Sequence, residues 1–433
     1  MKTNPRRPAT VNYRLNILFL FFICCWFSVV SQDKNIITGR VLNAETENVI
    51  PNASVFITNS SKGTITAANG TFALKSIPAG KYDLIISSVG YSTQVYSFSS
   101  DKLPLQLKIY LQPKVTELET VVVEPYEKDG WEKWGSFFIE NFIGTTDAAK
   151  LCKIRNYKTL RFRHSKKNNT LIAVADEPLI IENRELGYKI QYQLEDFSYD
   201  FGQHTMFYLG YTLFEDMAKN PDKIPKRFIR ERQKAYNGSI VHFMRSLYED
   251  QLIENGFEVR RLVRIPNNEK ERVRSIVHGR AGKTGGSNEK SGLPIRNNDA
   301  GPLASTRRNP DSIAYYDRIL KQKDYEEIIS KHTLTADSLV SVSDAGHILF
   351  FENYIHVMYR KAFEEPGYLL YSRENRKPYH PRSVVSLLNG NPVTIEKNGS
   401  AFPPTEFFSS GYWAWNEKIA HLLPADYDET ASR

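Results

Sequence analysis

The feature that most constrains this chain is a series of short β-like segments that recur every roughly eight to twelve residues over its N-terminal part. Glycine, proline and asparagine separate the segments, as in Asn69-Gly70 and Pro78-Ala79-Gly80. This spacing is typical of a small all-β sandwich. We predict a seven-stranded β-sandwich within residues 33–113, with strands over residues 36–42, 53–58, 63–67, 71–75, 82–88, 93–98 and 105–111.

Several short motifs follow one another in this region. They are Gly39-Arg40-Val41, Asn69-Gly70-Thr71-Phe72, Ile77-Pro78-Ala79-Gly80-Lys81-Tyr82 and Ser88-Val89-Gly90-Tyr91. In this order they resemble the carboxypeptidase regulatory-like domain. The resemblance implies a transthyretin-like (prealbumin-like) sandwich in an exported protein of Bacteroidetes type. It implies no peptidase activity, because the glycines suit turns and the tyrosines suit a core.

The first residues have the layout of an export signal. Lys2, Arg6 and Arg7 precede an apolar run from Leu15 to Val30, which predicts a secretory signal peptide over residues 1–31. The run is shorter than the roughly 20 apolar residues of a membrane-spanning helix. We therefore expect an exported protein that is periplasmic or associated with the outer membrane. Lipidation at Cys25 is an alternative that the sequence leaves open.

Net charge and cysteine content exclude some classes of protein. The chain carries a formal net charge of +8, and four of its positive charges precede residue 32. The remaining excess is too small to indicate nucleic-acid binding. Cys152 is the only cysteine after the expected signal peptide, so no internal disulfide can form. Its apolar neighbours predict a buried, unreactive thiol.

The rest of the chain predicts an α+β region after a linker over residues 114–129. Aromatic residues at helical spacing follow Gly130, and Gly144-Thr145-Thr146-Asp147 has the composition of a helix N-cap. The fold class is thus multidomain, an N-terminal sandwich followed by an α+β region. Its predicted parts are an α+β domain at 130–265, a polar linker or excursion at 266–310, and a β-rich segment at 311–433 that is either separate or part of the same domain.

Catalytic and metal-binding motifs are missing from the sequence. It contains no Gly-x-Ser-x-Gly and no His-Glu-x-x-His, and Lys283-Thr284-Gly285 lacks its usual companion motifs. The tightest histidine pair is His347 and His356. We expect one strand over residues 348–359, with His347 directly before it, so the two rings would point to opposite faces. We predict no catalytic residue, no cofactor and no metal site.

One binding feature remains. Trp413 and Trp415 are two residues apart, so on a strand they would share one face and form a candidate binding platform for a sugar ring or a partner's apolar edge. Core packing is the alternative for both side chains.

The sequence favours an exported, non-catalytic binding or scaffold protein of the bacterial cell envelope. The expected partner is an envelope protein or a glycan, with no nucleic acid, and membrane association would run through partners. One alternative is an exported hydrolase whose site lies within residues 117–433. Another is an accessory partner of TonB-dependent outer-membrane transporters, because Leu118–Val123 is similar to a linker in such transporters. A deep pocket with perturbed carboxylates and histidines would favour the hydrolase.

Overall fold

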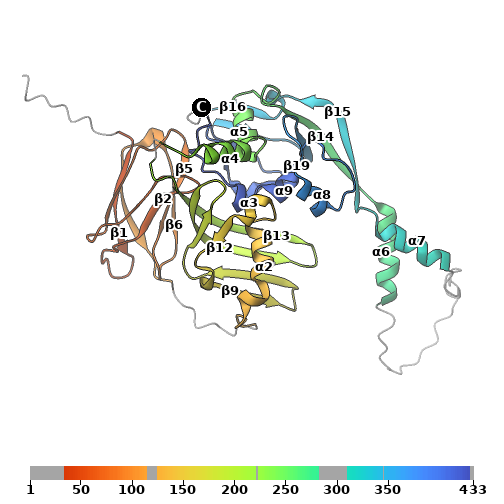
Figure 1. Ribbon diagram of the computed structural model, residues 1–433, viewed down its shortest axis with the longest axis horizontal. Helices are drawn as coiled ribbons and strands as arrows, with labels where there is room; N and C mark the ends of the chain where they lie inside the picture. Colours follow the sequence, from red (N-terminus) through yellow and green to blue (C-terminus); the bar gives the residue numbers. More distant parts are fainter. Residues whose placement is uncertain (1–33, 115–123, 221–222, 282–309, 345, 430–433) are drawn as a thin grey trace, which may run out of the picture.

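The computed structural model describes residues 34–114, 124–220, 223–281, 310–344 and 346–429. The expected signal peptide, Cys25 and the segment Leu118–Val123 lie outside the described residues. Within them the chain forms several sheets and a few helices (Figure 1). None of the described helices is long and apolar enough to cross a membrane.

The N-terminal unit consists of two facing sheets. One has the order β4-β1-β7 and the other β3-β2-β5-β6. Strand β1 pairs antiparallel with β4 and parallel with β7. The strands are β1 (Ile36–Asn43), β2 (Ser54–Ile57), β3 (Gly63–Ile65), β4 (Thr71–Lys75), β5 (Lys81–Ser87), β6 (Gln94–Ser99) and β7 (Leu105–Leu111).

Alternation along β5 sets the core of this unit. Tyr82, Leu84 and Ile86 point inward and are buried with residues of the opposite sheet. The signature Gly39 has a packing reason, because a Cβ there would lie 2.5 Å from the Leu107 carbonyl oxygen. Ile85 on the outer face of β5 is fully buried as well. That face must therefore be covered by the rest of the chain.

The second sheet is antiparallel, with the order β8-β11-β12-β10-β9 and with β13 paired to β12. Along β12 buried and partly exposed residues alternate, which gives this strand one dry and one wet face. Helix α2 (Gly130–Phe142) packs Phe138 and Phe142 into its core. The strands are β8 (Cys152–Ile154), β9 (Leu160–Ser165), β10 (Thr170–Ala175), β11 (Leu179–Asn183), β12 (Tyr188–Asp200) and β13 (Thr205–Asp216).

Two further sheets follow, with the orders β15-β14-β18-β19-β22 and β16-β17-β20-β21. Because β14 ends at Pro266 and pairs with β15 and β18, one sheet continues across the expected boundary at residue 265. The strands are β14 (Phe257–Pro266), β15 (Tyr325–Leu334), β16 (Val340–Ser343), β17 (Gly346–Leu349), β18 (Tyr354–Tyr359), β19 (Arg382–Leu387), β20 (Val393–Ile395), β21 (Ala401–Phe402) and β22 (Phe407–Gly411).

Short helices connect these sheets and one helical pair extends away from them. The excursion between β14 and β15 begins and ends as helices α6 and α7, which project from the body (Figure 1). The remaining helices are α3 (Asp147–Lys150), α4 (Lys226–Tyr236), α5 (Ile240–Tyr248), α6 (Asn268–Ala281), α7 (Pro310–Leu320), α8 (Pro366–Ser372) and α9 (Tyr412–Asn416), with 3₁₀ turns η1 (Ser100–Lys102), η2 (Tyr157–Thr159), η3 (Ala336–Ser338), η4 (Leu388–Gly390), η5 (Pro404–Glu406) and η6 (Ile419–His421).

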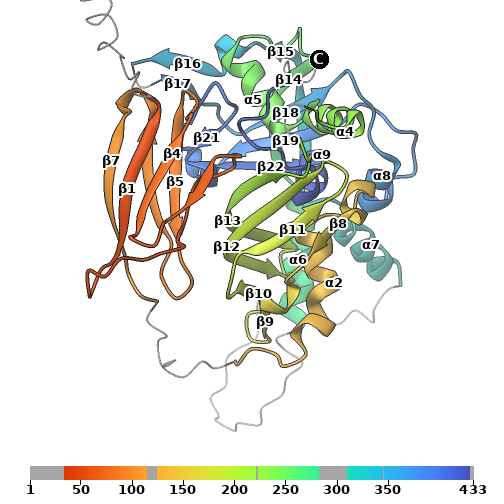
Figure 2. The ribbon, with the colours of Figure 1, turned by 60° about the vertical axis from the view of Figure 1, so that its left-hand side comes forward.

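The turn between β2 and β3 joins the N-terminal unit to the rest of the chain, beside the sheet that contains β12 and β13 (Figure 2). The Asn59 backbone N–H donates to the Thr212 carbonyl at 2.8 Å, and the Asn59 side-chain oxygen accepts from the Thr212 hydroxyl at 2.5 Å. The Ser61 N–H donates to the Asp426 carboxylate at 2.9 Å. These bonds fix the sandwich against both β13 and the C-terminal residues.

Replacing Asn59 with alanine should weaken this junction. Asn59 has φ 56°, which alanine adopts at a cost of about 1–2 kcal/mol, and the buried Thr212 hydroxyl would lose its acceptor at a cost of about 1–3 kcal/mol. Asn169 has φ 52° but lies away from the junction, so Asn169→Ala is the matched control. Urea denaturation should show a larger loss for Asn59→Ala. Equal losses would contradict a junction held by Asn59.

Candidate functional site

A candidate site is a cavity of about 820 Å³ where elements of the second and third sheets meet. Its wall combines the end of α2, the α3 turn, the β11–β12 turn and α4 with the end of β18, the loop around α8, and α9. Residues from Glu140 to His421 thus line one hollow. The volume falls in the range of roughly 300–1,000 Å³ that small-molecule sites occupy.

The α3 turn forms one side of the cavity. Thr146 is the N-cap of α3 and its hydroxyl accepts from the Ala149 N–H at 3.2 Å, which confirms the N-cap that the sequence predicts. The neighbouring Thr145 hydroxyl accepts a hydrogen bond from Trp415 Nε1 at 3.0 Å. This bond joins the α3 turn to a residue 270 positions later in the chain.

The two tryptophans singled out by sequence do not lie on a strand. Tyr412–Asn416 is the short helix α9, so the expected strand is wrong. Residues two apart on a helix point about 200° apart, and the pair shares no face. Trp413, 3% exposed, enters the core of the third sheet, where its Nε1 donates to the Gly238 carbonyl at 2.8 Å. Trp415, 1% exposed, lines the cavity with Tyr412.

His421 lies in the same wall in its neutral form. Its Nε2 is 2.9 Å from the Thr146 hydroxyl, and burial, with a smaller contribution from Lys234, lowers its pKa to about 4. At neutral pH the ring therefore offers hydrogen-bonding nitrogens without charge.

Acidic groups near the cavity have raised pKa values. Burial raises the pKa of Glu365, and the nearby Lys234 ammonium partly opposes this effect. Burial also raises the pKa of Glu417 to about 8 and lowers that of Lys418 to about 8. Lys418 Nζ donates to the Glu140 carbonyl at 3.2 Å, directly behind the cavity wall. Of these groups, Glu365 and His421 line the cavity, whereas Glu417 and Lys418 are not among its lining residues.

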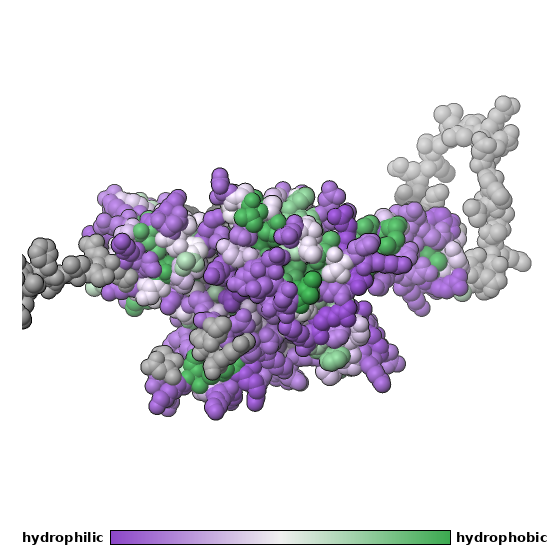
Figure 3. Space-filling view, turned by 90° about the horizontal axis from the view of Figure 1, so that it is seen from above, coloured by the Kyte–Doolittle hydropathy of each residue, from purple (hydrophilic) through white to green (hydrophobic). Residues whose placement is uncertain are grey.

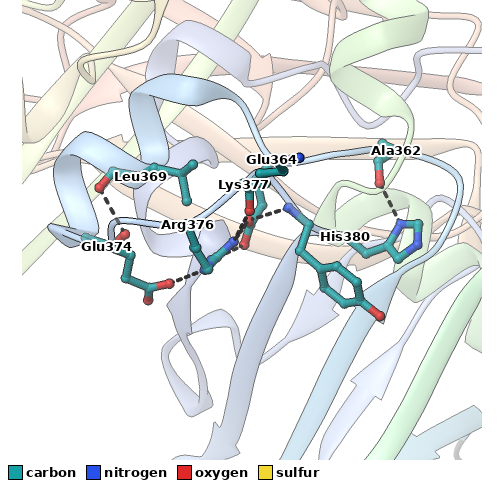
Figure 4. A network of polar contacts seen from close by, with 9 residues as sticks. Ala362, Glu364, Leu369, Glu374, Arg376, Lys377 and His380 are labelled. Atoms are coloured by element: carbon teal, nitrogen blue, oxygen red, sulfur yellow. Dashed lines mark hydrogen bonds and ion pairs between the residues drawn. The ribbon is translucent and has the colours of Figure 1, made fainter.

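The loop that carries α8 covers part of the cavity and is held by a buried ion pair (Figure 4). The Glu364 side chain is fully buried and accepts from both terminal nitrogens of Arg376 and from the Tyr379 N–H. His380 Nδ1 lies 2.9 Å from the Ala362 carbonyl oxygen. These contacts close residues 362–380 into a compact flap.

The flap exposes apolar side chains around the cavity. Leu370 is 82% exposed, Phe363 66% and Tyr371 58%, and all three line the cavity. The Phe363 ring stacks on His380 with centroids 5.0 Å apart. Seen from above, the described surface is mainly hydrophilic and its apolar groups form separate clusters (Figure 3). An exposed apolar rim on a cavity is a typical feature of a binding site.

Other candidates from the sequence lie elsewhere. His347 and His356 are on two strands, β17 and β18, so the single expected strand is wrong. Cys152 is partly buried, and burial raises its pKa to about 12, which opposes thiolate formation. Within the described residues, no three His, Cys, Asp or Glu side chains come together as metal ligands. Lys283-Thr284-Gly285 lies outside these residues.

Sequence reasoning missed the cavity itself. Its walls come from segments that are far apart in the chain, and no local motif marks them. A usable signal was the charged pair Glu417-Lys418 inside the apolar stretch from Tyr412 to Leu423. Charged residues in a buried segment often mark a functional place.

The fold of residues 36–111, two facing sheets around one core, defines the N-terminal unit as a β-sandwich. Residues 37–123 match the CarboxypepD_reg-like domain family. The N-terminal unit is therefore a CarboxypepD_reg-like domain, as the motifs predict.

No curated protein matches the chain. Among solved structures, it is similar to a chain of a type II cohesin–X-dockerin complex from Acetivibrio cellulolyticus, with 22% identity, TM-score 0.17 and coverage of 18% of this chain and 58% of the other. A candidate carbohydrate-binding protein from Bacteroides uniformis has 11% identity, TM-score 0.15 and coverage of 44% and 82%. A candidate membrane-associated protein of unknown function from Bacteroides fragilis has 10% identity and a TM-score of 0.14, and the match covers 87% of this chain and 94% of the other. Similarity at these TM-scores assigns neither fold nor function.

Arg376→Ala should strongly destabilise the flap. It leaves the fully buried Glu364 carboxylate without its cation. Breaking a fully buried ion pair in this way lowers the free energy of unfolding by about 3–5 kcal/mol. The loss should be smaller here, because Arg376 retains contact with water. The double variant Glu364→Gln/Arg376→Ala should lose less, because no unpaired charge is buried. Thermal unfolding measures both. A single variant as stable as the wild type would show that the ion pair does not hold the flap.

The neutral His421 should make stability depend on pH. Its folded-state pKa of about 4 lies below the usual 6.5, so the unfolded chain binds the proton more readily. This contribution to stability is complete above pH 6.5 and is lost as the pH falls towards 4. His421→Gln should flatten the urea-unfolding profile in that window, whereas His332→Gln at an exposed position should not. Identical profiles for wild type and His421→Gln would refute this prediction.

Proposed function

We propose that this chain is an exported binding protein of the bacterial cell envelope, of Bacteroidetes type, whose ligand occupies the cavity between the second and third sheets. The single observation that carries the proposal is this cavity of about 820 Å³ with an exposed apolar rim. A preformed hollow beside a clamped flap needs little reorganisation when a ligand enters. The proposal places the protein in the periplasm or at the outer membrane, after removal of residues 1–31.

The CarboxypepD_reg-like domain has a different part in this proposal. As a seven-stranded, transthyretin-like sandwich it would attach the cavity-bearing part to a second envelope component. Its junction through Asn59 and Ser61 supports a fixed attachment, since both residues bond to the body of the chain. Among the residues that the structure describes, no side chain of this domain lines the cavity. Binding and attachment would then be separate tasks of two parts.

A hydrolase is the second candidate, and one observation favours it. Glu365, whose pKa is raised, and the neutral His421 line the same cavity, as an acid–base pair would require. If the protein is a hydrolase, Glu365 would donate a proton to the leaving group. If the wild type forms a hydrolysis product and Glu365→Gln does not, the protein is a hydrolase and not only a binding protein.

Tyr371→Ala should weaken ligand binding at least tenfold, because Tyr371 is 58% exposed on the cavity rim and an aromatic anchor there contributes contact area. Tyr96→Ala, on strand β6 of the sandwich, is the matched control. Panels of soluble oligosaccharides and short peptides can be screened by thermal shift, since a ligand that binds the native state raises the melting temperature. If no panel member stabilises the wild type, or if each stabilises Tyr371→Ala equally, the cavity is not the binding site.

A further inference from the structure

The cavity is acidic although the chain as a whole is basic. Five carboxylates line it, against two lysines, whereas the chain carries a net charge of +8. Both lysines are already paired. Lys150 lies 2.7 Å from Asp147, and Lys234 lies 4.0 Å from Glu365. A third lining carboxylate, Glu231, has the Arg230 guanidinium at 2.8 Å. Cations from the protein itself therefore neutralise only part of the lining.

Two carboxylates, Glu140 and Glu185, remain for a ligand, and the Lys418 ammonium near Glu140 makes Glu185 the less neutralised of the two. Within the described residues neither carboxylate has a hydrogen bond or an ion pair. The backbone at Glu185 is held in place, because its N–H and that of Leu186 donate to Asn183 Oδ1 at 3.1 and 3.0 Å. Asn183 is itself fully buried and donates to the Ala420 carbonyl at 2.8 Å. The Glu185 carboxylate is partly buried and has no partner of its own in the described part of the chain, and such a carboxylate favours a cationic group.

The other lining groups suit a ring with hydroxyl groups. Tyr371 and Phe363, 58% and 66% exposed, supply aromatic surface that can stack on apolar ring faces or attract an ammonium group, whereas the lining residues Trp415 and Tyr412 are almost fully buried and add little of this surface. Asn237, Asn416 and the neutral His421 supply uncharged donors and acceptors. The lining thus combines carboxylates, aromatic faces and neutral hydrogen-bonding groups.

The wall also disfavours an extended peptide. One common way in which an extended peptide binds is by adding a strand to a free sheet edge. Apart from Tyr359 at the end of β18, the lining residues come from helices, turns and loops. Strand β18 lies between β14 and β19, so both of its edges are paired. A peptide backbone would have no strand edge to pair with in this cavity.

Resting on the proposed function, we propose that the cavity selects an amino sugar, with the protonated amine near Glu185 and Glu140 and the sugar ring against the aromatic wall. The ligand class is an oligosaccharide that contains unacetylated hexosamine. Recognition by charge distinguishes it from the neutral, N-acetylated form of the same sugar, which has the same ring and lacks the cation.

The test compares two probes that differ mainly in the amine. Calorimetry at pH 6 on the whole purified protein measures the glucosamine trimer against the N-acetylglucosamine trimer. We expect the glucosamine trimer to bind at least tenfold more tightly. Glu185→Gln should reduce this preference at least fivefold, because it removes the charge that attracts the amine. Glu326→Gln, at an exposed position of β15, should change neither affinity.

Each outcome separates this inference from the proposed function. Equal affinity for the two trimers would overturn the amino-sugar assignment and leave cavity binding intact. Binding of the tripeptide Lys-Ala-Lys, with no binding of either trimer, would also overturn it. Tighter binding of the glucosamine trimer that is unaffected by both Tyr371→Ala and Glu185→Gln would place the sugar outside the cavity and contradict both proposals.

Discussion

The architecture depends on one short stretch near the C-terminus, residues 412–427, which enters the cores of the second and third sheets and bonds to the β2–β3 turn of the sandwich. Trp413 enters the core of the third sheet, and Ile419, Ala420 and Leu423 enter that of the second. The Ala420 N–H donates to the Ile143 carbonyl at 3.1 Å. Two residues beyond Leu423 the chain reaches the sandwich, where the Ala425 N–H donates to the Asn59 carbonyl. This segment therefore joins the sandwich, the second sheet and the third sheet to one another.

The cavity is a consequence of this arrangement. The segment passes between the second and third sheets, and its Trp415 and His421 bond to consecutive threonines of the α3 turn, Thr145 and Thr146. These bonds set the spacing between the two halves of the wall. Arg245 of α5 adds bonds to the carbonyls of Ala425 and Tyr427, each at 3.0 Å. Polar contacts to the C-terminal segment thus help to position the wall of the cavity.

Local signals predicted the sandwich well. Turns such as Asn69-Gly70 and the alternation around Leu84 are encoded within a few residues, and the observed strands follow them within about two residues. The same reasoning failed over residues 348–359, where two strands replace one. Asn353 has φ 62° between them, and an asparagine before Tyr354 was an available turn signal.

The candidate site was less accessible to sequence reasoning, because its contacts span the chain. Trp415 meets Thr145 across 270 positions, and no pattern in either segment specifies the other. The spacing of Trp413 and Trp415 is compatible with a strand, but the segment forms a short helix. The Trp413 ring enters the core of the third sheet, and the Trp415 ring packs in a separate cluster with Tyr368 and Tyr412. Tertiary packing overrides local periodicity in such short segments.

Hydrogen exchange followed by mass spectrometry, on the whole protein with and without the glucosamine trimer, tests the central claim most directly. A ligand in the cavity slows exchange where it restricts local opening. The account predicts slower exchange in peptides that cover residues 145–150, 231–238, 362–371 and 412–421, with little change in residues 36–111. Protection confined to the sandwich, with these four segments unchanged, would contradict it.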